Sequence, residues 1–167
     1  IILAYFTKQL NLQRDNSILK YVSNTLENYV ENIVVKEELL NAKEFISHLK
    51  MFLSHEILLN DLIKGLIESD IGYIYSSLSL FIQANTYFEK ALLKLRKTEN
   101  QNYAKIAQNL LFQGYGYVML GDFKQAQNIL GQSINIYKKY VPNDQVKLTL
   151  GLVYLGDSYR WTGDYEE

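Results

Sequence analysis

The sequence contains no cysteine and a single proline, Pro142, in 167 residues. Without cysteine the chain can form no disulfide bond and carries no thiolate, which fits a reducing compartment, so we expect a cytoplasmic protein. A β-sandwich or β-barrel usually takes more turn-forming residues than this. No apolar run approaches the roughly 18 residues that a membrane-spanning helix needs, and the opening run IILAYF is soon followed by Lys8. We therefore expect neither a β architecture nor contact with a membrane.

Net charge and histidine are also scarce. The formal net charge is −1, so no overall field attracts nucleic acid. The basic stretch KLRKTEN at 94–100 does not extend into a continuous stripe. His48 and His55 are the only histidines; they share one face of an expected helix, but a metal site requires further ligands, and only Glu44 and Glu56 lie near them. We expect no nucleic-acid partner, no metal and no cofactor.

What the chain does have is an ordinary globular composition, 48% hydrophobic and 21% charged. Its length is sufficient for one domain with a hydrophobic core. The chain starts at Ile1 rather than at methionine, and it stops at Glu167 inside a repeated motif. We therefore expect a fragment of a longer protein, with flanking domains outside these residues.

Three glycines, Gly114, Gly116 and Gly121, fall within the stretch GYGYVMLGDF. A phosphate-binding loop needs its glycines between a strand and a helix, with a Lys-Ser/Thr pair or a GxGxxG spacing. These glycines fit neither spacing and follow the helical stretch YAKIAQNLLFQ. Related stretches, GYIYSSLSLF at 72–81 and GDSYRWTGDY at 156–165, recur at a step of 42 residues. The recurrence favours close helix packing over nucleotide binding.

The repeat predicts a pair of helices in each unit. A glycine and a tyrosine three residues later lie on one helix face, a turn follows, and an apolar stripe then marks a second helix. Glycine at the turn ends the first helix, and aspartate after it caps the second. The residues aligned at the 42-residue step are Gly72, Gly114 and Gly156; Tyr75, Tyr117 and Tyr159; Phe81, Phe123 and Tyr165; Ala84 and Ala126; Phe88 and Leu130; Ala91 and Ser133.

These residues resemble the tetratricopeptide repeat. The units exceed the usual period of about 34 residues and are similar in length to those of kinesin light chains and of bacterial NB-ARC-type signalling proteins. Two kinesin-type features differ, because Asn143 and Asp144 stand where His-Pro is usual, and Leu111-Phe112 and Val153-Tyr154 replace paired asparagines. The resemblance implies an all-α fold, an α-solenoid in which helical hairpins form a right-handed superhelix.

The expected organisation has two parts. Residues 61–167 form the repeat region, with units at about 66–107, 108–149 and a partial unit at 150–167. Residues 1–60 form a helical lead-in, for whose second half two interpretations stay open. The segment SHLKMFLSHE resembles the linker before the repeats of the bacterial ATPases. Alternatively, a degenerate repeat supplies its second helix, with core positions Leu39, Ala42, Ile46 and Leu49.

The resemblance also implies a binding surface, since the first helix of each hairpin lines a concave groove in such arrays. The candidate groove residues are Tyr73, Phe112, Tyr115, Met119, Tyr154, Asp157, Arg160 and Trp161. The same positions include Ser69, Asp70, Leu111 and Val153, of which the last two have packing against the next repeat as their alternative. For Trp161 the alternative is packing against a further repeat.

The expected function is non-catalytic binding of a protein or peptide segment, because no Ser-His-carboxylate arrangement or other coherent catalytic set is present. Two alternatives stay open. The chain could be the ligand-sensing region of a larger signalling ATPase, which an upstream phosphate-loop motif would support. It could also be a module of a peptide-pheromone receptor, which saturable binding of a short peptide would support.

Overall fold

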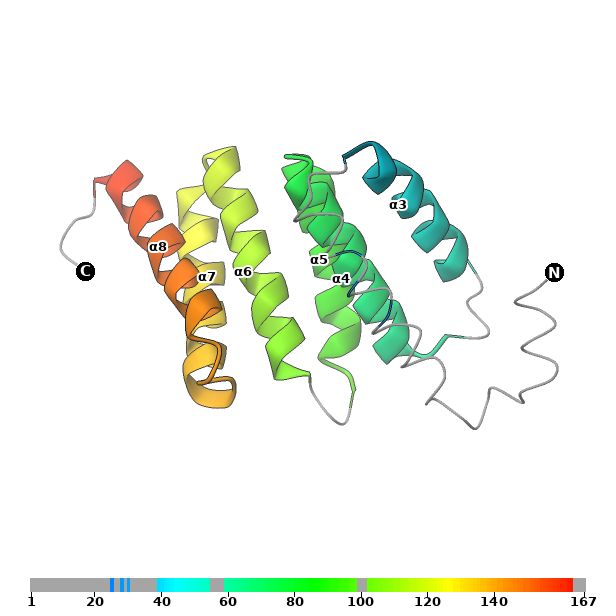
Figure 1. Cartoon of the computed structure of the whole chain (residues 1–167). Helices are drawn as coiled ribbons and strands as arrows, with labels where there is room; N and C mark the ends of the chain where they lie inside the picture. The colour runs from blue at the N-terminus through cyan, green and yellow to red at the C-terminus, as the bar shows by residue number, and fades with distance from the viewer. Residues whose placement is uncertain are drawn as a thin grey trace.

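The computed structural model describes Thr25, Asn28, Val30 and residues 39–54, 59–98 and 102–163. Within these residues the chain forms helices and no strand, so the expected all-α class is confirmed for the described part. The helices stand side by side in a row from α3 to α8 (Figure 1). Their bounds are α3 Leu39–Leu53, α4 Asp61–Ser77, α5 Phe81–Leu95, α6 Tyr103–Leu120, α7 Phe123–Tyr140 and α8 Gln145–Thr162.

Consecutive helices pack against one another throughout this row. The most extensive contacts are those of α4 with α5 and of α6 with α7, and each pair also contacts the next helix along the chain. Gly65 lies against Leu95 while Gly72 lies against Phe88, so α4 and α5 run antiparallel. In addition, α4 contacts α6 and α6 contacts α8 directly. The helices α4, α6 and α8 therefore form one layer, and α5 and α7 pack against it.

The first helix of each pair begins with the same side-chain cap. The Asn60 Oδ1 accepts from the Ile63 backbone N–H at 2.9 Å, and the corresponding bonds at Asn102 and Asp144 measure 3.2 and 3.1 Å. Such a cap satisfies a backbone donor that the helix itself leaves unpaired. Residues 60, 102 and 144 are 42 apart, so helix initiation follows the period of the sequence.

The turns between paired helices repeat as well. Gly121 and Gly163 both have φ of +79°, and Ser79 takes the same left-handed region at φ +58°. Glycine adopts this region without a steric penalty, whereas serine does so with strain. The expected glycine C-cap is confirmed at Gly121 and Gly163, and the Asp122 side chain accepts from the Gln125 N–H at 3.2 Å as the cap of α7.

The glycines of α6 lie where another helix comes close. A Cβ atom on Gly114 would lie 2.5 Å from Leu130 Cγ, and one on Gly116 would lie 2.6 Å from Asn85 Oδ1. The interpretation of these glycines as packing residues is therefore confirmed. Gly156 differs, because no described atom lies within 4 Å of its Cβ position. The repeat alignment predicts that a neighbouring helix packs closely at Gly156, and no helix among the described residues does so.

Two apolar clusters make up the core. The first joins α3, α4, α5 and the start of α6 around Ile67, Ile71 and Ile74. The second joins α6 and α7 around Leu111, Leu130 and Tyr137, with α8 packed against it. Of the helices in the described part of the chain, none is both long and apolar enough to cross a bilayer.

Helix α3 has the same length as α5 and precedes it by the same 42 residues at both ends. Its stripe Ala42, Ile46 and Leu49 is buried, as is the stripe of α5, which comprises Ala84, Phe88 and Ala91.

His48 on α3 is exposed, while His55 and Glu56 lie outside the described residues. No group of three or more potential metal ligands occurs in the described ranges.

Candidate functional site

The candidate site is the face formed by the layer of α4, α6 and α8. Two pairs of aromatic rings bridge these helices: Tyr73 of α4 lies 4.8 Å from Phe112 of α6, and Tyr115 of α6 lies 4.7 Å from Tyr154 of α8, centroid to centroid. All four side chains are partly exposed. We call these four residues the aromatic strip. It contains four of the eight residues that the sequence assigned to a groove.

The spacing within α6 explains the strip. Phe112 and Tyr115 are three residues apart, so both project from one side of the helix, slightly offset around its axis. Because of this offset, the Phe112 ring contacts Tyr73 of α4 and the Tyr115 ring contacts Tyr154 of α8. Tyr115 also meets Phe81 edge to face at 5.6 Å. The strip is therefore held in place by rings from three helices and by the start of α5.

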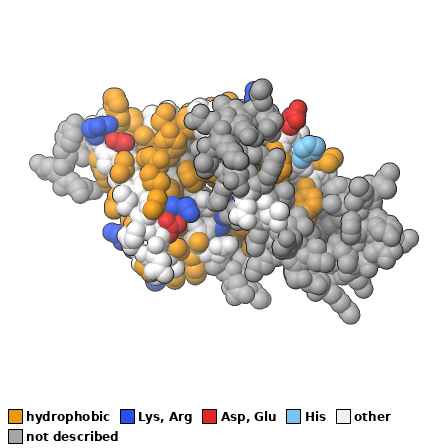
Figure 2. All heavy atoms as spheres, in the orientation of Figure 1, with side chains coloured by type: hydrophobic (Ala, Val, Ile, Leu, Met, Phe, Trp, Pro, Cys, Tyr) orange, Lys and Arg blue, Asp and Glu red, His pale blue; other side chains and the backbone are white. Residues whose placement is uncertain are grey.

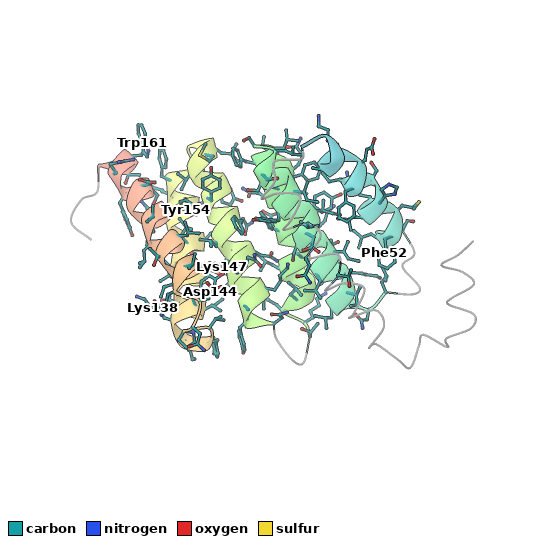
Figure 3. The ribbon with its side chains drawn as sticks, in the orientation of Figure 1. Phe52, Lys138, Asp144, Lys147, Tyr154 and Trp161 are labelled. Atoms are coloured by element: carbon teal, nitrogen blue, oxygen red, sulfur yellow. The ribbon has the colours of Figure 1, made fainter. Side chains whose placement is uncertain are left out.

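The Tyr154 side chain is partly buried. Burial raises the pKa of the Tyr154 phenol, and the neighbouring Tyr115, Tyr73 and Asp157 raise it further. Tyr154 is thus neutral at physiological pH and available as a hydrogen-bond donor and acceptor. Figure 3 shows it directed from α8 toward α6, and Figure 2 shows hydrophobic side chains gathered over α6 and α8 on the same side.

A polar cluster lies beside the strip, between α4 and α6. The Lys105 ammonium lies 3.0 Å from Asp70 Oδ1, and Asn109 Nδ2 donates to Ser69 Oγ at 2.7 Å. All four residues are buried. Together with Tyr73 and Phe112 of the strip they line a small pocket, whose lining comprises Val30, Ser69, Asp70, Tyr73, Phe88, Lys105, Gln108, Asn109 and Phe112.

Val30 forms part of the wall of this pocket. Its side chain is only 1% exposed, its backbone is helical, and it belongs both to the pocket lining and to the first apolar cluster. A branched aliphatic side chain therefore reaches the α4–α6 face from a part of the chain well before α3. Apolar side chains with a few placed polar partners are typical of binding pockets.

The remaining predicted residues lie near the C-terminal ends of α6 and α8. Arg160 forms an exposed ion pair with Asp157 at 3.0 Å, and Met119 is exposed. Trp161 is 67% exposed and its ring lies parallel to that of Phe123 at a centroid distance of 6.4 Å. Figure 3 places Trp161 at the end of α8, away from Tyr154. Asp157 lies near enough to Tyr154 to contribute to the raised pKa of its phenol.

One groove assignment is wrong, because Leu111 is fully buried in the second apolar cluster, as its packing alternative expected. Val153 is exposed, so its packing alternative is unmet within the described residues and its place in the groove stays a prediction. Sequence reasoning also missed Lys105 and Asn109, which lie 35 and 40 residues from their partners on α4 and so escape a 42-residue alignment. The available signal was a lysine and an asparagine within the otherwise apolar stretch YAKIAQNLL.

The sequence matches no family model and no curated protein. The resemblance to tetratricopeptide repeats therefore rests on the aligned residues of the sequence alone.

Proposed function

We propose that this chain is a non-catalytic scaffold of the tetratricopeptide type, an α-solenoid that binds a peptide segment of a partner protein on the α4/α6/α8 face. The observation that carries the proposal is the aromatic strip, which runs across the layer of α4, α6 and α8 while its rings stay partly exposed. Aromatic side chains dominate the binding energy of protein interfaces because they bury a large area at a small entropic cost.

The chemistry beside the strip indicates the kind of segment that binds. The phenols of Tyr115 and Tyr154 can exchange hydrogen bonds with a peptide backbone. We infer that the partner segment makes apolar contacts with the exposed parts of the four rings, in an extended or helical conformation.

The repeat assignment is part of the same proposal. The capping residues, the left-handed turn residues and the helix starts all recur at 42 residues, which supports hairpin units of one kind. The matching bounds and buried stripes of α3 and α5 support α3 as the second helix of a degenerate unit. Under this proposal the repeats extend into the second half of the lead-in at 1–60.

The proposal is tested by selecting peptides from a random displayed library on the whole chain and measuring the dissociation constant of the best one by fluorescence anisotropy. We expect saturable binding that weakens at least about tenfold in Tyr115→Ala and in Tyr154→Ala, as for residues at the centre of an interface. Leu93→Ala is the matched control, because Leu93 is an exposed apolar residue on α5, outside the layer. Circular dichroism verifies that each variant stays folded.

Failure to select any peptide would contradict the proposal. Equal weakening by Leu93→Ala and by the strip variants would also contradict it, because the binding surface would then lie elsewhere.

A further inference from the structure

Four exposed basic side chains form two pairs at one edge of the row of helices. Arg96 and Lys97 directly follow α5, and Lys138 and Lys139 lie in the last turn of α7. The two pairs are 42 residues apart, so they occupy the same position in successive units. Figure 1 shows the ends of α5 and α7 at the same lower edge of the row, with the start of α6 between them. We call these four residues the basic edge.

The charge of the basic edge is not neutralised by described carboxylates. Each neighbouring lysine at the end of α5 or at the start of α6 or α8 lies within 3.1 Å of a carboxylate oxygen, in the pairs Lys94–Glu68, Lys105–Asp70 and Lys147–Asp144. By contrast, no residue of the basic edge forms an ion pair with a carboxylate in the described part of the chain. The edge is therefore a local concentration of positive charge on a chain whose net charge is −1.

Side-chain contacts hold two of these cations in place. The Arg96 guanidinium donates to Gln132 Oε1 at 3.4 Å, so it reaches from the end of α5 to α7. The Lys139 ammonium lies 4.9 Å from the centre of the Tyr140 ring, and this ring stacks on Tyr103 of α6 at a centroid distance of 3.9 Å. The edge is therefore joined across α5, α6 and α7. Cations that are already positioned lose less freedom when they meet an anionic ligand.

A short anionic segment fits this edge better than an extended polyanion does. Exposed charges act over about 8 Å at physiological salt, so a short ligand meets mainly the local positive field. A nucleic acid or an anionic membrane extends beyond the edge and meets the rest of a chain whose net charge is −1. Tyr103 stacks on one face of Tyr140 and the Lys139 ammonium lies over the other, which leaves no platform at Tyr140 for a nucleobase.

We propose that the basic edge binds an acidic segment of a partner protein, whose aspartate or glutamate side chains pair with the two basic pairs. Carboxylates accept charge-assisted hydrogen bonds from arginine and lysine, and complementary charge speeds association and selects the partner. The edge shares no residue with the aromatic strip, so this proposal does not depend on the proposed function.

The test titrates a fluorescently labelled glutamate-rich peptide with the whole chain and follows the anisotropy. A second peptide carries glutamine in place of every glutamate. We expect saturable binding of the glutamate peptide alone, weakening as salt is raised, because the contacts lie at the surface. Lys138→Gln combined with Lys139→Gln, and Arg96→Gln combined with Lys97→Gln, should each lower the affinity at least about threefold. Lys138→Arg combined with Lys139→Arg keeps the charge and should retain the affinity.

The matched control is Lys43→Gln combined with Lys124→Gln, which changes the net charge equally at two exposed lysines outside the edge. It should leave the affinity within about twofold of wild type. No binding of the glutamate peptide, or equal weakening by the control and by the edge variants, would overturn the proposal. Tighter binding of a single-stranded oligonucleotide or of vesicles containing anionic lipid through the same four residues would overturn the acidic segment as the occupant. Circular dichroism verifies that each variant stays folded.

Discussion

Tyr137 is fully buried in the second apolar cluster, and its hydroxyl oxygen has no hydrogen-bond partner in the described structure. A buried polar group without a partner costs about 1–3 kcal/mol of desolvation. Tyr137→Phe removes this group and keeps the ring. We therefore expect the free energy of unfolding in urea to stay constant or to rise by about 1 kcal/mol. A loss of more than about 1 kcal/mol would mean that the hydroxyl makes a stabilising bond.

Tyrosine titration gives a second expectation at the residue scale. Burial raises the pKa of Tyr154, Tyr117 and Tyr137 in the folded state. Above pH of about 10 the unfolded chain therefore loses phenolic protons that the folded chain still holds, so stability is complete below this pH and falls as pH rises. Urea unfolding measured at several values from pH 8 to 11 should show this decline, and Tyr154→Phe should make it shallower. A Tyr154→Phe curve parallel to wild type would contradict the assigned surroundings of Tyr154.

At the scale of the elements, a buried ion pair joins α4 to α6. Removing one charge of such a pair leaves the other uncompensated, which typically costs about 3–5 kcal/mol, whereas replacing both charges costs much less. We expect Lys105→Met to lower the free energy of unfolding by an amount in this range, and Asp70→Leu combined with Lys105→Met to recover part of the loss. Thermal and urea unfolding of the single and double variants measure the difference. A double variant less stable than the single one would contradict this interpretation.

The repeated glycines provide an internal comparison between two helices. Gly114→Ala should destabilise the protein by about 1–3 kcal/mol, because its Cβ would overlap Leu130. Gly156→Ala should stabilise it by about 0.5–1 kcal/mol, because the position is open and alanine favours the helix. Differential scanning calorimetry of both variants measures the two shifts. Shifts of the same sign would show that the two glycines do not differ in their contacts.

The elements could be predicted from sequence wherever the signal is local. The glycine at 121, its following cap Asp122 and the stripe of Ala126 and Leu130 predict where α6 ends, where α7 begins and which side of α7 is buried. The candidate site could be predicted only in part. Repeat alignment identifies Tyr115 and Tyr154, but it cannot show which rings meet.

Contacts between residues at different positions of the repeat could not be predicted from the sequence. Lys105 pairs with Asp70 at a separation of 35 residues, and the Trp161 ring lies parallel to that of Phe123 at the start of α7. Val30 reaches the pocket from the lead-in. Each of these depends on how far one helix is shifted and rotated against the next, which is a property of packing rather than of local pattern.

On the scale of the whole molecule, the aromatic strip lies on the α4/α6/α8 face, where three helices each contribute rings. Each described helix contacts its neighbours along the chain. The core consists of two clusters that meet at α6. Such an arrangement offers a long surface for one partner segment.

The central claim is that the aromatic strip binds a partner peptide. The most direct measurement is a two-dimensional NMR titration of the isotope-labelled chain with the peptide selected on it. We expect the largest shift changes at Tyr73, Phe112, Tyr115 and Tyr154, with little change on the outer side of α5. Changes confined to α5 and α7, with the strip unaffected, would contradict the claim.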